Sequence, residues 1–206
     1  MKRLKTLLVV TALAGIAGAI AGDMITKGAL AIGSTAPMAD TKLKNVDGNM
    51  LSIADAKGAK GTLVLFSCNH CPFVIAWEDR IVALGNAAQA AGVGVIQINS
   101  NDPSAHAEDG FDQMVTRAKE KGMQFPYVVD GTSGIAKAFG ATRTPEAFLF
   151  DASGKLVYHG TIDDNVQDAA AVKETYLKNA IDAVASGKAP AVKETKAIGC
   201  GIKFRS

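Results

Sequence analysis

Two apolar runs in the first half of the chain predict buried strands. Residues 62–66 and residues 93–99 contain no charged side chain and are mostly aliphatic. Apolar runs of this length without strict alternation are typical of strands that are covered on both faces. Residues 127–130 form a third, shorter run, which is apolar up to Asp130. The three runs predict the centre of a sheet.

Between these runs the apolar positions recur at helical spacing. In residues 72–91 the apolar positions are Phe73, Ala76, Trp77, Ile81, Leu84 and Ala88. Gly92 follows and is a typical end signal for a helix. Residues 109–121 and 171–186 have the same amphipathic pattern, and residues 135–139 predict a brief helix.

Two further segments have the period-two alternation of β-hairpins. Residues 41–53 alternate around Asp47-Gly48-Asn49, and residues 144–151 and 155–159 flank a second turn, Ala152-Ser153-Gly154. Alternating strands and helices followed by a hairpin predict an α/β fold. We expect a three-layer sandwich with a mixed central sheet, an N-terminal hairpin extension and helices on both faces.

The first 21 residues have the pattern of an export signal. Met1–Lys5 is positively charged, residues 6–21 are uncharged, and Ala19-Ile20-Ala21 offers a small-x-small cleavage site. The apolar run is roughly 15 residues, shorter than the about 20 that a membrane span needs. We predict a cleaved signal peptide and a periplasmic or secreted protein. An uncleaved N-terminal membrane anchor is the alternative.

Removing this segment changes the charge of the chain. Three positive charges and no acids are lost, so the formal charge falls from +2 to −1. A near-neutral mature chain excludes an electrostatic nucleic-acid binder, and we expect no nucleic-acid partner. The remaining pattern predicts a linker over residues 22–35, one domain over residues 36–187 and an extended tail over residues 188–206.

The cysteines suggest the chemistry. Cys68 and Cys71 stand two residues apart, after a predicted strand and directly before Pro72 at a predicted helix start. Unpaired N–H groups and the dipole at a helix N-terminus favour thiolate over thiol. His70, beside both sulfurs, can lower a thiol pKa further and make the couple more oxidising. This pattern predicts a redox-active dithiol with Cys68 and Cys71 in disulfide range.

Other uses of these residues are less favoured. A structural disulfide across so small a loop would add little stability. A zinc site could use Cys68, His70, Cys71 and Cys200, but the chain has no second CxxC and no HxxxH. A copper-binding chaperone with two thiolates and a histidine remains an alternative of a different class. We expect no bound metal and no cofactor.

The order of motifs resembles a known family. A strand, Cys68–Cys71, a helix, another strand and a later Thr144-Pro145 resemble the thioredoxin fold. Residues 140–151 and 197–204 resemble the redoxin (AhpC/TSA-type) family, within it the peroxiredoxin-like thioredoxin-family branch that carries C-N-H-C-P. The resemblance extends from about Gly33 to Phe204, nearly the whole mature chain. It implies a thioredoxin-like sandwich and thiol–disulfide exchange.

The resemblance also implies roles for individual residues. Cys68 would be the nucleophile and Cys71 the resolving cysteine. Pro145 would be a cis-proline facing the disulfide, and Thr144 and Glu146 beside it would help to bind an extended substrate. Glu146 is also the nearest candidate for the acid that thioredoxins bury beneath their dithiol, although a surface glutamate is as compatible with the pattern. The implied partners are protein disulfides or dithiols and a membrane or periplasmic thiol reductant or oxidant.

Two positions depart from the peroxiredoxin pattern. That pattern, P-x-x-x-[TS]-x-x-C, would place proline and a hydroxyl residue where this chain has Gly61 and Leu65. Where the family's arginine is expected the chain has Pro145, with Arg143 two residues earlier. Peroxide reduction is therefore the alternative enzymatic interpretation, after protein disulfide exchange.

Four residues outside the CxxC pair complete the set of candidates. His106, in a loop, and His159, at a strand end, have no partner in the sequence, and we assign them no role. Glu78 is expected to be solvated on its helix. Cys200, between two glycines, is either a small buried residue that fixes the tail or a third redox thiol. We expect Cys68–Cys71 to be the main internal disulfide, because the tail must first be brought to the pair.

Overall fold

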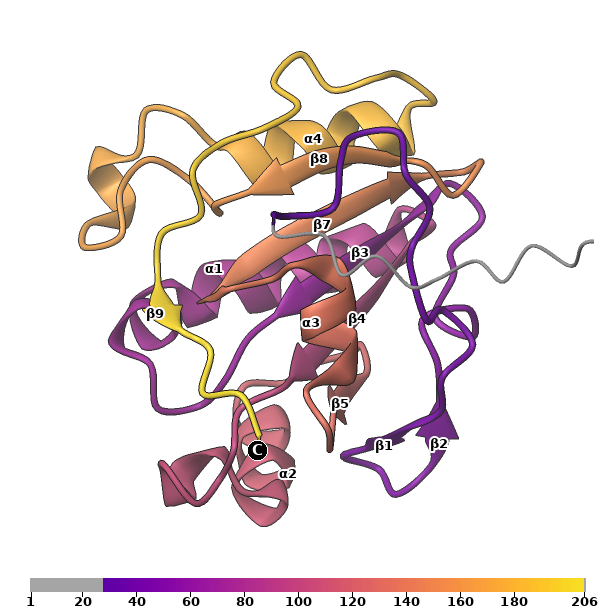
Figure 1. Ribbon diagram of the computed structural model, residues 1–206. Helices are drawn as coiled ribbons and strands as arrows, with labels where there is room; N and C mark the ends of the chain where they lie inside the picture. The colour runs from indigo at the N-terminus through magenta and orange to yellow at the C-terminus, as the bar shows by residue number, and fades with distance from the viewer. Residues whose placement is uncertain (1–27, 206) are drawn as a thin grey trace, which may run out of the picture.

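A mixed sheet of seven strands forms the centre of the structure, a computed structural model that describes residues 28–205 (Figure 1). Its strand order is β2-β1-β5-β4-β3-β7-β8. β3 is parallel to β4 and antiparallel to β7, and β4 is parallel to β5. The strands are β1 (Leu43–Asn45), β2 (Met50–Leu51), β3 (Gly61–Phe66), β4 (Val93–Asn99), β5 (Tyr127–Val129), β7 (Glu146–Asp151) and β8 (Leu156–Gly160).

Helices cover both faces of this sheet. α1 and α4 pack on one face and α3 packs on the other, while α2 packs against β5 (Figure 1). The helices are α1 (Pro72–Ala90), α2 (Phe111–Glu120), α3 (Gly134–Phe139) and α4 (Tyr176–Ala185), with short 3-10 helices η1 (Ala107–Asp109) and η2 (Ala169–Ala171). The predicted three-layer α/β sandwich is confirmed, and both predicted hairpins are present as β1–β2 and β7–β8.

The two central strands owe their position to their apolar sequences. Every residue of β3 and β4 is buried. Successive side chains of a strand point to opposite faces, so Leu63 and Leu65 contribute to the core under α1 and α4. Val64 and Phe66 contribute to the core under α3. The carboxyl end of β3 therefore emerges between two packed layers, and the CxxC segment follows directly.

Helix α1 matches its prediction closely. Trp77 is fully buried, and its indole N–H donates a hydrogen bond to Asp163 Oδ1 at 2.8 Å. Gly92, just after the helix, has φ +88°, a conformation that favours glycine over other residues. The apolar stripe and the glycine stop signal thus determine both the packing face and the end of α1.

The final helix is shorter than residues 171–186, the range that its apolar spacing predicts. α4 begins at Tyr176. Before it, Asp168 accepts a hydrogen bond from the N–H of Ala170 and caps a single 3-10 turn, and Asp164 accepts one from the N–H of Lys173. Local side-chain acceptors therefore hold these residues outside a helix, although alanine favours helix.

The predicted linker is partly a component of the domain. The predicted signal peptide, residues 1–21, lies outside the described residues, as does the first part of the linker. From residue 28 onward the chain packs on the fold: the N–H of Leu30 donates to Phe139 O and that of Gly33 to Leu156 O. Within residues 28–205, none of the helices has the length and apolar character that crossing a membrane requires.

The tail after α4 is extended, as predicted, and returns across the molecule. It ends beside β6 (Arg143–Thr144), with which β9 (Cys200–Gly201) forms a separate two-stranded antiparallel sheet. Figure 1 shows the tail running from α4 to β9 and on to the C-terminus. There Arg205 N–H donates to Ser133 Oγ at the start of α3. The pairing brings a cysteine 129 residues away in sequence next to Cys71.

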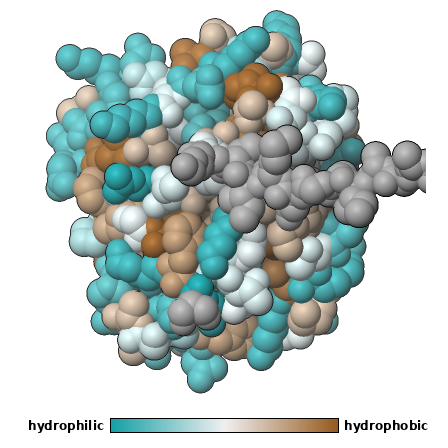
Figure 2. Space-filling model, in the orientation of Figure 1, coloured by the Kyte–Doolittle hydropathy of each residue, from teal (hydrophilic) through white to brown (hydrophobic). Residues whose placement is uncertain are grey.

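Hydrophobic side chains on the surface are scattered. Figure 2 shows them in small groups between hydrophilic residues on the face it presents. The large exposed hydrophobic residues of the described chain are Met38, Met50, Ile75, Val115, Val192, Ile198 and Phe204. Val192, Ile198 and Phe204 lie on the tail after α4, and Met38 and Met50 line one pocket beside β1 and β2.

Candidate active site

Cys68 and Cys71 lie at the junction of β3 and α1. Cys68 comes two residues after β3, and Cys71 is the N-cap of α1, with Pro72 in the first turn. Cys71, rather than Cys68, therefore occupies the helix N-terminus that the sequence assigns to the nucleophile. Both cysteines are buried, with 1% and 0% of their surface exposed.

Thr144, the last residue of β6, faces this pair. The Thr144 hydroxyl lies 3.3 Å from Cys68 Sγ, and its carbonyl oxygen lies 3.2 Å from Cys71 Sγ. The Thr144–Pro145 peptide bond is cis, as the resemblance implies. β3 and β7 pair directly, with Phe66 opposite Glu146, and this register brings Thr144 beside the cysteines.

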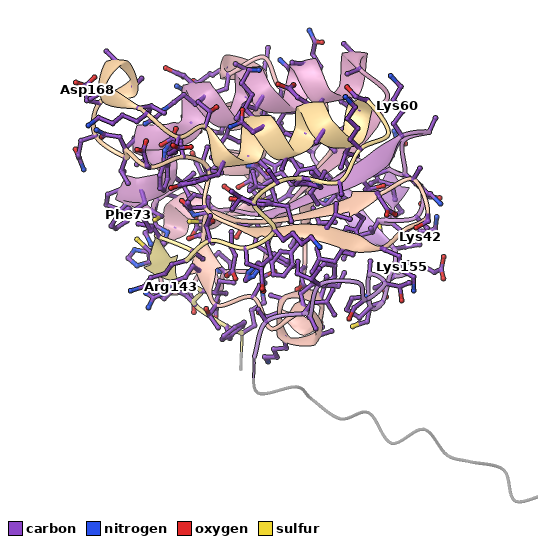
Figure 3. The ribbon with its side chains drawn as sticks, turned by 90° about the horizontal axis from the view of Figure 1, so that it is seen from above. Lys42, Lys60, Phe73, Arg143, Lys155 and Asp168 are labelled. Atoms are coloured by element: carbon purple, nitrogen blue, oxygen red, sulfur yellow. The ribbon has the colours of Figure 1, made fainter. Side chains whose placement is uncertain are left out.

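The third cysteine is already in contact with the pair. Cys200 Sγ lies 2.6 Å from Cys71 Sγ, and Cys200 pairs with Thr144 in the β6–β9 ladder. In Figure 3, Phe73 at the start of α1 and Arg143 in β6 lie at the same end of the molecule as β9. The expectation that the tail must first be brought to the pair is therefore wrong. Strand pairing with β6 holds it there.

The thiols of the CxxC pair influence each other's ionisation. The hydrogen bond to Cys71 is the main cause that raises the pKa of Cys68, followed by burial and the negative charge of Asp109. The same hydrogen bond lowers the pKa of Cys71, and the contact with Cys200 lowers it further. In the reduced protein the first negative charge is therefore favoured on Cys71, and Cys68 keeps its proton.

This arrangement predicts a thiolate at unusually low pH. The pKa of Cys71 is lower in the folded protein than the about 8.5 of an unfolded thiol, so its ionisation stabilises the reduced protein above that pH. This stabilisation is lost as pH falls through the lowered pKa. The ultraviolet absorbance of thiolate, followed against pH, should show one ionisation below about 8.5 that is missing in Cys71→Ser. A single transition at or above that pH in the wild type would contradict the assignment.

His70 is held by a carboxylate that sequence analysis missed. His70 Nδ1 lies 2.6 Å from Asp109 Oδ2, and Asp109 is buried. The backbone N–H groups of Asn69 and His70 donate to Asp109 Oδ1 at 2.7 and 3.2 Å, and the Asn101 amide donates to Oδ2 at 2.8 Å. Asp109 thus fixes both the ring and the backbone between the cysteines. No local motif marks it, because its partners are 39 and 8 residues away.

His106 also belongs to this cluster, although the sequence gives it no role. Its ring stacks on His70, with the ring centroids 3.6 Å apart and an angle of 14° between the planes. Asp109 on one edge and His106 on one face together set the orientation of the His70 ring. Donor atoms of Cys68, His70 and Asp109 all lie within 4.8 Å of one another, a spacing that a metal ion could use.

Glu146 is buried, so the surface alternative is wrong. Its Oε2 accepts hydrogen bonds from the N–H groups of Thr142 and Arg143 at 2.8 and 2.9 Å. Its Oε1 lies 2.7 Å from Nε2 of His159, which therefore does have a partner. These contacts commit the carboxylate to the loop before Pro145. Glu146 thus supports that loop, whereas the sequence suggests it as the acid beneath the dithiol.

Removing the charge of Glu146 should loosen this loop. Glu146→Gln retains the shape of the side chain. However, glutamine has one acceptor oxygen where glutamate has two, so it cannot accept both from the two backbone N–H groups and from His159. We expect a loss of about 1–3 kcal/mol of unfolding free energy in urea denaturation. Glu174→Gln, at an exposed position, is the matched control. Equal stability of the two variants would show that the Glu146 contacts contribute nothing.

Glu78 is likewise buried, which corrects the expectation of a solvated side chain. Glu78 Oε2 lies 3.2 Å from Arg117 and 3.0 Å from Lys121. Arg117 also donates a hydrogen bond to the carbonyl oxygen of Asn69 at 2.9 Å. This ion pair therefore connects α1 and α2 to the CxxC segment.

Comparisons with known proteins agree with this geometry. Residues 32–159 match the AhpC/TSA family. A thiol-disulfide oxidoreductase, ResA, of Geobacillus thermodenitrificans is 27% identical over 157 residues, covering 74% of this chain and 83% of ResA.

Two solved structures of uncharacterised proteins are also similar. One, from Sinorhizobium meliloti, is 34% identical with a TM-score of 0.79 and covers 87% of this chain and 97% of its own. The other, from Geobacillus kaustophilus, is 37% identical with a TM-score of 0.78 and covers 85% and 93%. A thioredoxin-family protein from Chlorobium tepidum has the same fold at 24% identity, with a TM-score of 0.51 over 64% of this chain and 87% of its own. The chain therefore belongs to the AhpC/TSA family, as a redox enzyme with a thioredoxin-like fold.

Proposed function

We propose that the protein is an exported thiol–disulfide oxidoreductase that exchanges the Cys68–Cys71 dithiol and disulfide with protein disulfides. The observation that carries the proposal is the buried cluster of Cys68 and Cys71, enclosed by Thr144 and the Asp109-bound His70. The ResA relative supports the reaction class. The signal-like pattern of residues 1–21 supports export to the periplasm or the exterior.

In the reducing direction the reaction begins at Cys68. Transfer of the Cys68 proton to Cys71 across their hydrogen bond places the negative charge on Cys68. The Cys68 thiolate attacks one sulfur of the client disulfide, and the other client sulfur leaves as a thiolate. Cys71 then gives its proton to the first client thiolate and attacks Cys68 Sγ, which releases the second client thiolate and forms the Cys68–Cys71 disulfide. The reverse sequence oxidises a client dithiol.

The other site residues have supporting roles. The Thr144 hydroxyl, 3.3 Å from Cys68 Sγ, can donate a hydrogen bond to the thiolate as charge develops there. Glu146 holds the loop before Pro145. An extended client segment that paired with the backbone of Thr144 and Pro145 would have to replace β9, which pairs with Thr144 in this structure. A membrane or periplasmic thiol reductant or oxidant would return the pair to its starting state.

A stoichiometric reaction tests this function directly. The reduced protein is mixed with insulin without any other reductant, and all thiols are then alkylated and identified by mass spectrometry. We expect one insulin disulfide to be lost for each protein disulfide formed, with Cys68 among the oxidised residues. Protein whose thiols were alkylated beforehand is the control. Complete retention of the reduced cysteines in the presence of insulin would refute the proposal.

Peroxide reduction is the second candidate, because the Thr144 hydroxyl lies beside Cys68 where the sequence has none at Leu65. One observation weighs against it: Arg143 is turned toward the tail, donating to Gly199 O. We expect reduced protein to react with hydrogen peroxide no faster than an ordinary low-pKa thiol in stopped-flow measurements. A rate typical of dedicated thiol peroxidases would make peroxide the substrate.

Copper binding is the candidate from another class. It is favoured by the Cys68, His70 and Asp109 donors and by the nearby sulfurs of Cys71 and Cys200. However, His70 Nδ1 and Asp109 Oδ2 lie 2.6 Å apart, and a metal bound by both of these atoms would have to break that contact. Anaerobic titration of the reduced protein with Cu(I) against a competing chelator distinguishes a carrier from an oxidoreductase. Weak binding together with active disulfide exchange is the expected result.

A further inference from the structure

The three sulfurs form a chain in which Cys71 is the central member. Cys71 is buried in one cluster with Cys68, and its Sγ lies 2.6 Å from that of Cys200. Cys68 and Cys71 are buried, whereas Cys200 is partly exposed. Cys71 can therefore form a disulfide with either neighbour, and only one of the two disulfides includes a sulfur with access to solvent.

We propose that Cys200 is a third redox thiol that takes over the disulfide from the buried pair and presents it to the external reductant. This inference rests on the proposed function and specifies how that site is recycled. The tail would then be a catalytic element, with β9 as the strand that positions its sulfur.

The tail is held closely enough for this role. An added Cβ on Gly199 would lie 2.2 Å from the carbonyl oxygen of Thr144, so the backbone approach requires glycine there. Beyond Cys200, the N–H of Ile202 donates to Thr142 O at 3.0 Å, and the N–H of Lys203 donates to the Asn101 side chain at 2.9 Å. Contacts on both sides of Cys200 thus fix its sulfur against Cys71.

The transfer is an internal disulfide exchange without net oxidation. After client reduction, Cys200 loses its proton to water, and its thiolate attacks Sγ of Cys71 in the Cys68–Cys71 disulfide. The Cys71–Cys200 bond forms, the Cys68–Cys71 bond breaks, and Cys68 leaves as a thiolate. An external dithiol then reduces Cys71–Cys200 and is itself oxidised to a disulfide. Cys68 is already a thiolate before that last step, which then frees Cys71 to resolve the next mixed disulfide.

Disulfide mapping tests the arrangement of the sulfurs. Cys68→Ser and Cys71→Ser are each incubated with oxidised glutathione, and their disulfides are identified by proteolysis and mass spectrometry. Cys68→Ser should form Cys71–Cys200 in most molecules. Cys71→Ser should form Cys68–Cys200 at least about ten-fold more slowly, because the central sulfur is absent. Failure of folded Cys68→Ser to form Cys71–Cys200, with circular dichroism as the folding check, would overturn the proposal.

Two glycine variants test whether docking of the tail is required. In the Cys68→Ser background, Gly199→Ala should reduce Cys71–Cys200 formation at least about ten-fold, since the added methyl group meets a backbone oxygen. Gly201→Ala is the matched control, because an added Cβ at Gly201 meets no atom within 4 Å. Equal yields of the disulfide in both variants would overturn the role assigned to β9.

The kinetic consequence is measured on proteins that retain Cys68. Oxidised wild-type protein should be reduced by dithiothreitol at least about ten-fold faster than oxidised Cys200→Ser, whose only internal disulfide is buried. Ile198→Ser, an exposed tail change, should match the wild type. Equal rates for wild type and Cys200→Ser would refute the relay even if insulin is reduced. Absence of insulin reduction with an intact relay would instead refute the proposed function.

Discussion

Replacing Cys68 with serine should abolish catalytic reduction of client disulfides. A hydroxyl cannot substitute for the thiolate that attacks the client, so the rate should fall by about three orders of magnitude or more, to the uncatalysed level. The measurement is insulin reduction under multiple turnover with dithiothreitol. Serine preserves the shape of the side chain, so the unfolding free energy should change much less than the activation free energy of the reaction.

Ser67→Ala is a suitable control for this experiment. Ser67 is fully buried beside Cys68, and within residues 28–205 its hydroxyl has no hydrogen-bond partner. Removal of this hydroxyl changes the same segment without breaking a hydrogen bond, so activity should be retained. If Cys68→Ser remained active while Cys71→Ser did not, Cys71 would be the nucleophile, as its lowered pKa alone would indicate.

Local patterns were sufficient to predict most of the fold. The run 62–66 became β3, and the helical spacing of residues 72–91 became α1, because each pattern reflects which side chains the neighbouring layers bury. The hairpin around Asp47–Asn49 likewise depends on neighbouring residues alone. The final helix was less predictable, because Asp164 and Asp168 capture backbone N–H groups that an isolated pattern assigns to the helix.

The candidate site could be predicted only where the CxxC motif itself marks it. Asp109 and His106 reach His70 from η1 and the loop before it, and no spacing rule connects them to residue 70. The contact between Glu146 and His159 depends on the register between β7 and β8. Sequence patterns predict that the two strands pair, but they do not predict which side chains come into contact. Cys200 lies in a recognisable motif, residues 197–204. Its position beside Cys71, however, depends on the path of the whole tail, which the motif does not predict.

One residue connects the histidine cluster to the tail. The Asn101 amide donates to Asp109 Oδ2 at 2.8 Å, while Asn101 Oδ1 accepts the N–H of Lys203 at 2.9 Å. The carboxylate that orients His70 therefore also helps to orient the group that anchors the residues after Cys200. A change at Asp109 should consequently affect the CxxC segment and the docked tail together.

Asp109→Ala should be among the most destabilising single changes in this protein. It leaves the His70 ring, two backbone N–H groups and the Asn101 amide without their buried acceptor. Such losses are not additive, and we expect about 3–5 kcal/mol of unfolding free energy in urea denaturation. Asp112→Ala, at an exposed position in the first turn of α2, should change it by less than about 0.5 kcal/mol.

A second readout separates the effect on the site from the effect on stability. Asp109→Asn keeps the volume and one acceptor oxygen, but its amide N–H₂ meets donors where Oδ2 now accepts. In folded Asp109→Asn, the His70 ring loses its anionic partner beside Cys68, and the thiolate absorbance profile should shift along the pH axis relative to the wild type. An unchanged profile, together with wild-type insulin reduction, would mean that Asp109 is a structural residue only. A shifted profile in a variant that is still folded would show that the Asp109 carboxylate acts on the thiols and is more than a structural residue.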